Sequence, residues 1–503
     1  MPTVAFPSLT GDELLRGTAL LGPVVAVVIT ALLVLILDLI PPDWLSRRPL
    51  MWVSALGILV ACALEGVLWA TGQVGQPAFG GFVAVDGFAV FFQLLFLVAA
   101  LLVILSSATF ADRQERIESE FYAITLFSTA GLMLMAAGNE LMTIYLALEL
   151  SSLSLAFLAT WNKQDRIAAQ GLKSSEAGIK FLLLSAMSTA VLLYGMALLY
   201  GLSGATTLAD IARVLAGTPT PAALLAITML VAGLGFKIAA APFQLWTPDV
   251  YQGAPTPATA FFSVASKSAG FAVVLRIFNS ALPGMSVEWG ALFGVLAFVT
   301  MTAGNLVAIV QTNIKRLMAY SSITHVGYML IGLASVSVAG SSAVMYYLLA
   351  YTFTNLAAFI VITVMAKYAP DDEISGYAGL AYRSPPLALA LSAGLLSLAG
   401  IPPFVGFFAK LYLFLAAIQT GSLGLQVLVI WALIMSAISL YYYGRIIHTM
   451  WMRDATETVP VRPAFSQGLA LFTSVVGVVA FGILAAPFLA ATQLAASAFG
   501  IGR

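Results

Sequence analysis

Residues 235–257 read GFKIAAAPFQLWTPDVYQGAPTP, an apolar stretch that contains Lys237 and is interrupted by Pro242. Residues 398–414, LAGIPPFVGFFAKLYLF, repeat the combination, with two prolines ahead of Lys410. Proline removes a hydrogen bond from a helix, and irregular backbone survives at membrane depth only inside protein or beside water. Both stretches therefore predict discontinuous transmembrane helices, each with a lysine close to the break.

The composition around these stretches is that of an integral membrane protein. Of 503 residues, 61% are hydrophobic and only 9% are charged, whereas soluble domains are about half apolar and about a quarter charged. The apolar runs are long and continuous, so the predicted fold class is all-α and polytopic. About fourteen spans are expected, near residues 18–40, 50–71, 83–109, 121–137, 140–160, 175–201, 222–247, 255–280, 288–310, 316–335, 341–367, 385–418, 424–450 and 466–495.

Several classes of site are disfavoured by what the sequence lacks. A single cysteine, Cys62, excludes a disulfide framework and cysteine-ligated metal centres, and two histidines disfavour a histidine-based one. The net charge is zero and no basic tract has interleaved aromatic residues, so nucleic acid is not an expected partner. No Walker loop or dinucleotide fingerprint is present. The chain is therefore expected to hold no cofactor or metal of its own.

The two broken segments divide the chain into blocks. Each broken segment is the fourth helix of a block of five helices. The first block comprises residues 121–280 and the second comprises residues 288–450. An odd number of helices makes the second block start on the opposite membrane face, which is the inverted-repeat arrangement of secondary transporters. A three-helix segment at 1–120 and a C-terminal helix at 451–503 complete the predicted organisation.

The distribution of cations predicts the orientation, because short cytoplasmic loops are enriched in lysine and arginine. One side carries only Arg16, Arg213 and Arg503. This asymmetry predicts that both termini lie outside the cytoplasm. The alternate loops on the other side carry Arg47, Arg48, Arg113, Arg116, Lys163, Arg166, Lys173, Lys315, Arg316, Lys367, Arg383, Arg453 and Arg462.

A few ionisable residues lie near the middle of apolar segments. A charge at the centre of a membrane helix costs about 2.5–3.5 kcal/mol even on lenient scales, so each needs a partner or a task. Because these residues lie at similar depths in their apolar segments, we expect them to form a row. In this row, buried lysines, a histidine and a carboxylate would exchange protons through water. The candidate proton pathway consists of Glu149, Lys237, Lys267, His325 and Lys410.

Structural interpretations remain open for these residues. The three lysines are alternatively structural ammonium groups, although their central positions disfavour snorkelling. Glu149 is alternatively a helix-packing carboxylate, and His325 a hydrogen-bonded core histidine. Lys180 follows Glu176 by four residues, where a local ion pair is the default interpretation. Because Lys180 points into an apolar run, it is also a further candidate for the row.

Six stretches resemble the antiporter-like membrane subunits of respiratory complex I, a family shared with multisubunit cation/proton antiporters. The resemblance implies about fourteen helices in two inverted repeats with broken seventh and twelfth helices. It also places the family's buried glutamate on Glu149 and its buried lysines on Lys237, Lys267 and Lys410. The stretches are the two broken segments together with LELSSLSL (148–155), EAGIKFLLLSAMSTAVLLYGMALLYG (176–201), SKSAGF (266–271) and NIKRLMAYSSITHVGYMLIGL (313–333).

Within this family the chain is most similar to the N type. The M type carries a glutamate in the twelfth helix, where this chain has Lys410, and the L type continues into a long lateral helix, whereas this chain stops at Arg503. The resemblance implies a proton-translocating subunit of NADH:quinone oxidoreductase. The animal mitochondrial counterpart lacks the first three helices, so the inner (plasma) membrane of a bacterium is expected, with both termini periplasmic.

The resemblance also implies where cofactors and partners lie. NADH, FMN, iron–sulfur clusters and quinone are expected in partner subunits. The expected neighbours are M-type, K-type and J-type membrane subunits, the lateral helix of the L-type subunit, and the lipid bilayer. Three alternatives remain: a subunit of a multisubunit cation/proton antiporter, a subunit of a membrane-bound hydrogenase-type complex, and a structural spacer without conduction. Co-purifying flavin and iron–sulfur subunits would distinguish a complex I subunit from a cation/proton antiporter subunit. A structural spacer would tolerate neutralisation of Lys237, and a hydrogenase-type complex would show a different electron-input module on purification.

Overall fold

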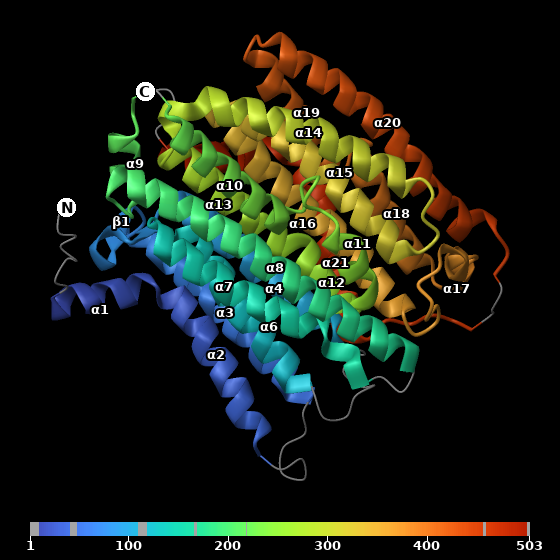
Figure 1. Cartoon of the computed structure of the whole chain (residues 1–503). Coiled ribbons are helices and arrows are strands. Elements are labelled where there is room, and N and C mark those ends of the chain that lie inside the picture. The colour runs from blue at the N-terminus through green and yellow to red at the C-terminus, as the bar shows by residue number, and fades with distance from the viewer. Residues whose placement is uncertain are drawn as a thin grey trace.

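The computed structural model describes residues 10–40, 48–108, 118–164, 168–217, 219–455 and 459–499. Within these ranges the chain forms a bundle of long helices packed side by side (Figure 1), which confirms the predicted all-α polytopic fold class. Several cations used for the orientation prediction lie outside the described residues: Arg47, Arg113, Arg116, Arg166 and Arg503.

The elements follow one another in three groups along the chain. The first group is α1 (Gly11–Leu20), α2 (Gly22–Asp38), α3 (Arg48–Ala70), the antiparallel strands β1 (Gln76–Ala78) and β2 (Val83–Val85), and α4 (Gly87–Ser106). The second group is α6 (Glu118–Ala137), α7 (Leu141–Ala159), α8 (Ala168–Ser203), α9 (Leu208–Val214), α10 (Pro221–Ile238), α11 (Trp246–Gly253), α12 (Thr256–Phe261), the π-helical turn η3 (Phe262–Ser266) and α13 (Lys267–Ser280). The third group is α14 (Ser286–Ala308), α15 (Ile314–Ala334), α16 (Val338–Met365), α17 (Leu380–Arg383), α18 (Pro385–Ala399), α19 (Val405–Gln419), α20 (Leu423–Met452), α21 (Phe465–Ile483) and α22 (Ala485–Ala496).

The number of spans is close to the prediction. Among the described residues, 12 helices are long and apolar enough to cross a membrane, and the pair α1–α2, bent by 75°, raises the number to 13. The span predicted at 385–418 is divided at its predicted break into α18 and α19, each 15 residues long. Neither half alone is as long as the ~20 residues that a span requires.

Both predicted breaks are present. The first separates α10 from α11 over residues 239–245, and the second separates α18 from α19 over residues 400–404. Each first half-helix is closed by a left-handed residue, Ala239 with φ 62° and Gly400 with φ 89°. A residue in the left-handed conformation ends a helix because the residues after it can no longer continue the helical pattern of backbone hydrogen bonds. The assignment of these breaks to two inverted blocks stays a prediction.

The C-terminal segment differs from the single span expected at 466–495. It contains two helices, α21 and α22, which meet at Leu484. Pro487 lies in the first turn of α22, where its missing N–H is tolerated. In one continuous helix the same proline would remove a hydrogen bond and clash with the preceding turn, so the chain breaks just before it.

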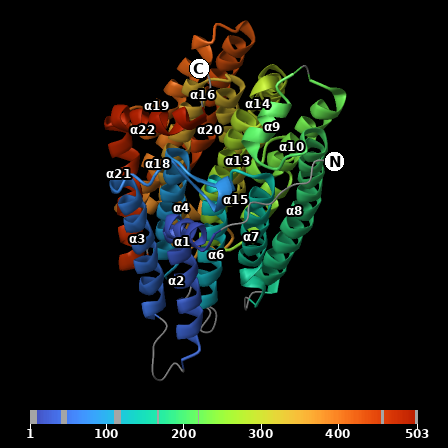
Figure 2. The same cartoon turned by 90° about the vertical axis from the view of Figure 1, so that its left-hand side faces the viewer.

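The helices differ greatly in how deeply they lie inside the bundle. In an 18-residue stretch of each of the spans at residues 256–280, 314–334 and 338–365, 100%, 94% and 94% of the residues are buried. By contrast, only 28% of the residues are buried in such a stretch of α20, which forms an outer edge of the molecule in Figure 1, and 33% in α8, which forms an edge in Figure 2. Because α13 and α15 are central, most of their polar side chains are enclosed by protein.

A buried ion pair joins the first group of helices to this centre. Arg276 of α13 donates from both terminal nitrogens to the carboxylate of Asp86, each at 2.9 Å. Asp86 also accepts from the Ala89 backbone N–H at 2.8 Å and so caps α4. The Arg276 side chain is only 3% exposed. Its charge therefore depends on Asp86 for compensation.

We expect Asp86→Asn to lower the free energy of unfolding by about 3 kcal/mol, because it leaves a buried guanidinium without a countercharge. Denaturant-induced unfolding of the purified chain in detergent measures this. The control is Asp210→Asn, which removes an ion pair to Arg213 whose side chains are 43% and 78% exposed. Exposed pairs contribute less than about 1 kcal/mol. Equal effects of the two substitutions would contradict the prediction.

Candidate proton pathway

Lys237 lies in the last turn of α10, immediately before the first break, and its side chain is buried. Its Nζ donates to the hydroxyls of Ser151 at 3.1 Å and Ser152 at 2.9 Å, both on α7. A Cβ at Gly270 of α13 would lie 3.3 Å from Lys237 Cγ, so α13 packs directly against the lysine stem. The ammonium is thus held by neutral hydroxyls on the neighbouring helix.

Glu149 lies on α7, two residues before the first of these serines, and is half-buried. Its Oε1 is buried without a hydrogen-bond partner. Among the described ion pairs, none within 4.0 Å joins Glu149 to Lys237, although the two side chains interact electrostatically. The structure therefore brings them into the same region without direct contact.

Lys267 begins α13, directly after the π-helical turn η3, and is buried. Its Nζ donates to the Ser322 hydroxyl at 2.6 Å, and that hydroxyl donates to the Ala319 carbonyl at 2.6 Å. The ammonium also lies 5.6 Å from the centre of the Tyr251 ring, within range of a cation–π interaction. Turns of π-helix recur at functional sites because they redirect the residues that follow.

His325 lies on α15, in the same helix as Ser322, and is buried. Its Nδ1 is 2.7 Å from the Tyr347 hydroxyl, and its Nε2 is 3.2 Å from the Tyr443 hydroxyl. The Tyr443 hydroxyl also bonds to Ser321. A neutral imidazole has one donor and one acceptor nitrogen, so this ring can accept a proton on one side and release one on the other.

Lys410 lies on α19 and reaches back to the second break. Its Nζ donates to the carbonyls of Leu398 and Ala399, each at 2.9 Å, and to the Ser436 hydroxyl at 2.7 Å. The last carbonyls of a helix have no intrahelical partners and form the negative end of its dipole. The end of α18 is therefore a preformed ammonium site. Gly400 is needed there, because its φ is 89° and a Cβ would lie 3.0 Å from Lys410 Cδ.

Lys180 belongs to a different cluster. Its Nζ contacts Glu176 at 2.6 Å and Asp249 at 2.7 Å, and its side chain is 39% exposed. Asp249 also accepts from Arg316 Nη1 at 2.9 Å. The local ion pair expected from the spacing is thus present, and Asp249 extends it across α8, α11 and α15. No hydrogen bond or ion pair among the described residues connects Lys180 to the five row residues.

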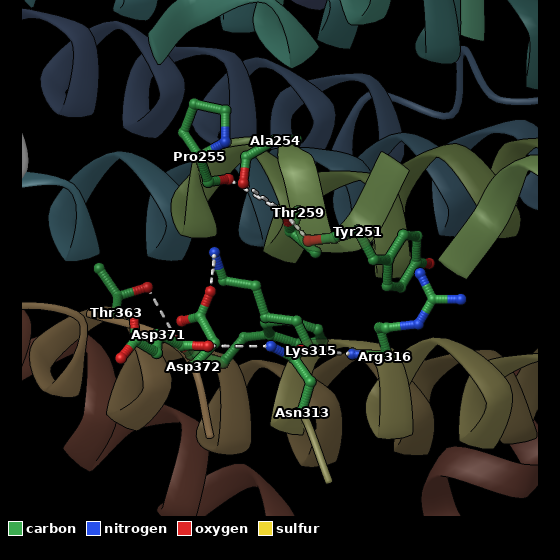
Figure 3. Close-up of polar contacts among 11 residues, drawn as sticks. Tyr251, Ala254, Pro255, Thr259, Asn313, Lys315, Arg316, Thr363, Asp371 and Asp372 are labelled. Atoms are coloured by element: carbon green, nitrogen blue, oxygen red, sulfur yellow. Dashed lines mark hydrogen bonds and ion pairs between the residues drawn. The ribbon is translucent and has the colours of Figure 1, made fainter. Parts of the chain in front are cut away.

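The N-terminus of α15 is also fixed by contacts with the loop after α16 (Figure 3). Lys315 forms an ion pair with Asp372 at 3.0 Å, and both side chains are largely buried. Asn313 caps the helix by accepting from the Arg316 backbone N–H at 3.1 Å and donates to the Asp371 carbonyl at 3.1 Å. The loop after α16 therefore anchors the helix that carries Ser322 and His325.

The hydroxyl partners were not among the residues proposed from the sequence. Ser151 and Ser152 were detectable in principle, because they follow Glu149 by two and three residues in the quoted stretch LELSSLSL. Tyr443 offered no comparable signal, since its contact with Ser321 joins positions 122 residues apart. Only the packing of α20 against α15 brings these two side chains together.

Comparison with known proteins identifies the family of the chain. The sequence profile described as NADH:quinone oxidoreductase/Mrp antiporter, TM, matches residues 138–439. The NADH-quinone oxidoreductase subunit N of Trichlorobacter lovleyi is 44% identical over 90% of this chain and 91% of its own length, and that of Desulforamulus reducens is 40% identical over 96% and 98%. A chain of respiratory complex I from Thermus thermophilus superposes with a TM-score of 0.77 and 34% identity, covering 94% of this chain and 99% of that one. The chain therefore belongs to the NADH:quinone oxidoreductase/Mrp antiporter family of membrane subunits.

Proposed function

We propose that this chain is the N subunit of a bacterial NADH:quinone oxidoreductase and that it translocates protons along the row of Glu149, Lys237, Lys267, His325 and Lys410. One observation carries the proposal: the row's buried nitrogens bond to hydroxyls and carbonyls instead of carboxylates. A carboxylate in contact would hold an ammonium as a fixed ion pair. A hydroxyl both accepts and donates a proton, so it leaves the neighbouring nitrogen free to exchange.

The packing supports transfer between successive members of the row. Lys267 and Gly270 lie one turn apart on α13, and Gly270 packs against the stem of Lys237. Ser322, which holds Lys267, lies one turn before His325 on α15. His325 in turn interacts electrostatically with both Lys267 and Lys410. In the proposed pathway, protons pass between these groups through the intervening hydroxyls and water.

The electron-transfer chemistry is assigned to other subunits in this proposal. NADH, FMN, iron–sulfur clusters and quinone would be held by partners, and this subunit would be non-redox. M-type, K-type and J-type subunits and the lateral helix of the L-type subunit would be its neighbours in the bacterial inner membrane, with both termini periplasmic. Mass spectrometry of the natively purified assembly tests this. Flavin and iron–sulfur subunits are expected, whereas an assembly without any electron-input subunit would favour a cation/proton antiporter.

Continuity of the row through α20 gives a sharper test. Tyr443→Phe removes the hydroxyl shared by His325 and Ser321 and is expected to reduce proton pumping severalfold at unchanged assembly. Tyr346→Phe is the matched control, because that phenol is buried, its hydroxyl donates to the Phe481 carbonyl at 2.7 Å, and it has no contact with His325 among the described residues. Pumping is measured in vesicles per NADH oxidised. Equal losses in the two variants would argue against a role for Tyr443 in proton transfer.

A further inference from the structure

Two hydrogen-bonded groups of side chains lie next to each other in the middle of the row. In the first group, Lys267 Nζ donates to the Ser322 hydroxyl at 2.6 Å. In the second group, the imidazole nitrogens of His325 lie 2.7 Å from the Tyr347 hydroxyl and 3.2 Å from the Tyr443 hydroxyl. Lys267 and His325 interact electrostatically, but no side-chain hydrogen bond among the described residues joins the two groups. A proton that leaves Lys267 for His325 therefore needs a further group to carry it.

Tyr351 lies next to both groups. It is on α16, one turn after Tyr347, so the two phenols lie on the same face of that helix. The centre of the Tyr351 ring is 5.4 Å from the centre of the His325 ring. Its phenol interacts with the Ser322 hydroxyl of the first group and with the phenols of Tyr347 and Tyr443 in the second. Tyr351 is therefore within reach of both groups.

The Tyr351 hydroxyl is not committed to either group. Its oxygen is buried and has no hydrogen-bond partner among the described residues, and the whole side chain is only 3% exposed. Nearly all buried polar groups in proteins are hydrogen-bonded, so an exception calls for an explanation. A hydroxyl without a partner can form a hydrogen bond to either of two neighbouring groups without first breaking one.

We propose that Tyr351 is the proton-transfer residue that connects Lys267 to His325, an inference that rests on the proposed function of the row. Ser322 Oγ accepts a proton from Lys267 Nζ and passes its own proton to the Tyr351 oxygen. Tyr351 then releases its original proton to the Tyr443 oxygen, and Tyr443 gives its own to His325 Nε2. Lys267 ends as a neutral amine and His325 as an imidazolium. Each of the three hydroxyls again carries one proton.

A second phenol shows that position, more than residue type, distinguishes Tyr351. Tyr251 of α11 also has a buried hydroxyl without a hydrogen-bond partner among the described residues, and it also interacts with Ser322. Its ring lies 5.6 Å from Lys267 Nζ. Within the described part of the chain it has no contact with His325. Tyr251 therefore faces only the first group, whereas Tyr351 faces both.

Tyr351→Phe keeps the ring beside His325 and removes only the hydroxyl. We expect proton pumping per NADH oxidised in vesicles to fall severalfold at unchanged assembly. Tyr346→Phe is the matched control on the same helix, because its buried hydroxyl donates to the Phe481 carbonyl at 2.7 Å. This control should pump as well as the unsubstituted protein. Equal pumping by the two variants would overturn the proposal.

A fluorinated tyrosine separates a proton-transfer role of Tyr351 from a structural one. Replacing Tyr351 by difluorotyrosine keeps the ring and the hydroxyl but makes the phenol more acidic. We expect this protein to pump protons with a pH profile shifted toward lower pH, and the same replacement at Tyr346 to leave the profile unchanged. An unchanged pH profile after replacement at Tyr351 would show that the hydroxyl has only a structural role, and would overturn the proposal.

Lys267→Ala in the same vesicles distinguishes failure of this inference from failure of the proposed function. Loss of pumping in both Lys267→Ala and Tyr351→Phe, with normal pumping in Tyr346→Phe, is the expected result. Loss in Lys267→Ala alone would mean that the row conducts protons without Tyr351, which overturns this inference and leaves the proposed function standing. Normal pumping in both variants would overturn the two together.

Discussion

Glu149→Gln and Lys237→Ala are each expected to assemble normally and to lose most proton pumping, by about tenfold or more, equivalent to about 1.4 kcal/mol in the rate-limiting barrier. Lys237→Ala deletes the ammonium that Ser151 and Ser152 hold. Glu149→Gln keeps the shape of the side chain but removes the negative charge that acts on this ammonium. Pumping in reconstituted vesicles, normalised to assembled complex, is the measurement.

The double variant decides whether the two residues act as one unit. The ammonium bonds to the two serines and forms no ion pair with the carboxylate among the described residues. We therefore propose that a small displacement of α7 against α10 switches Lys237 between hydroxyl and carboxylate partners. Combining the substitutions should then cost little more than either alone, with a coupling energy of about 0.5–3 kcal/mol. Fully additive losses would show that they work independently. Glu176→Gln is the control, because that glutamate is 61% exposed and pairs with Lys180 outside the row.

Lys410→Glu is expected to reduce proton pumping by at least about tenfold while leaving assembly nearly unchanged. The ammonium site at the end of α18 presents two carbonyl oxygens, which only accept hydrogen bonds. An ionised carboxylate would be repelled from them and from the negative end of the helix dipole. The glutamate side chain can still bind and release a proton, so the loss of proton pumping would follow from the reversed charge at position 410.

The measurement compares pumping with the amount of assembled complex. Lys367→Glu reverses the charge of an exposed lysine in the loop after α16 and serves as the control. Its pumping should equal that of the unsubstituted protein. Wild-type pumping by Lys410→Glu would place Lys410 outside the pathway, and failure to assemble would be resolved by Lys410→Gln, which removes the charge without reversing it.

The fold class and the helix breaks were predictable because they depend on local sequence. Long apolar runs require helices in lipid, and the prolines after Lys237 and before Lys410 mark the two interruptions. The exact ends were less accessible. Ala239 ends α10 in a left-handed conformation, which alanine adopts only at a steric cost. The residue type at this position therefore gave no signal that the helix ends there. The split at Leu484 was missed because the apolar pattern continues across it.

The sequence by itself determined which residues are expensive to bury: a glutamate, three lysines and a histidine within apolar helices, whose desolvation cost is a property of each side chain and its segment. Only the tertiary structure decided what compensates each one. Lys237 bonds to serines on α7, Lys267 to Ser322 on α15, and Lys410 to the end of α18 and to Ser436 on α20. These contacts join separate helices, and a hydroxyl has no sequence pattern that distinguishes a partner of an ammonium from one bonded to its own backbone. Packing of the central helices supplies that distinction, because it fixes which hydroxyls and carbonyls face a buried charge.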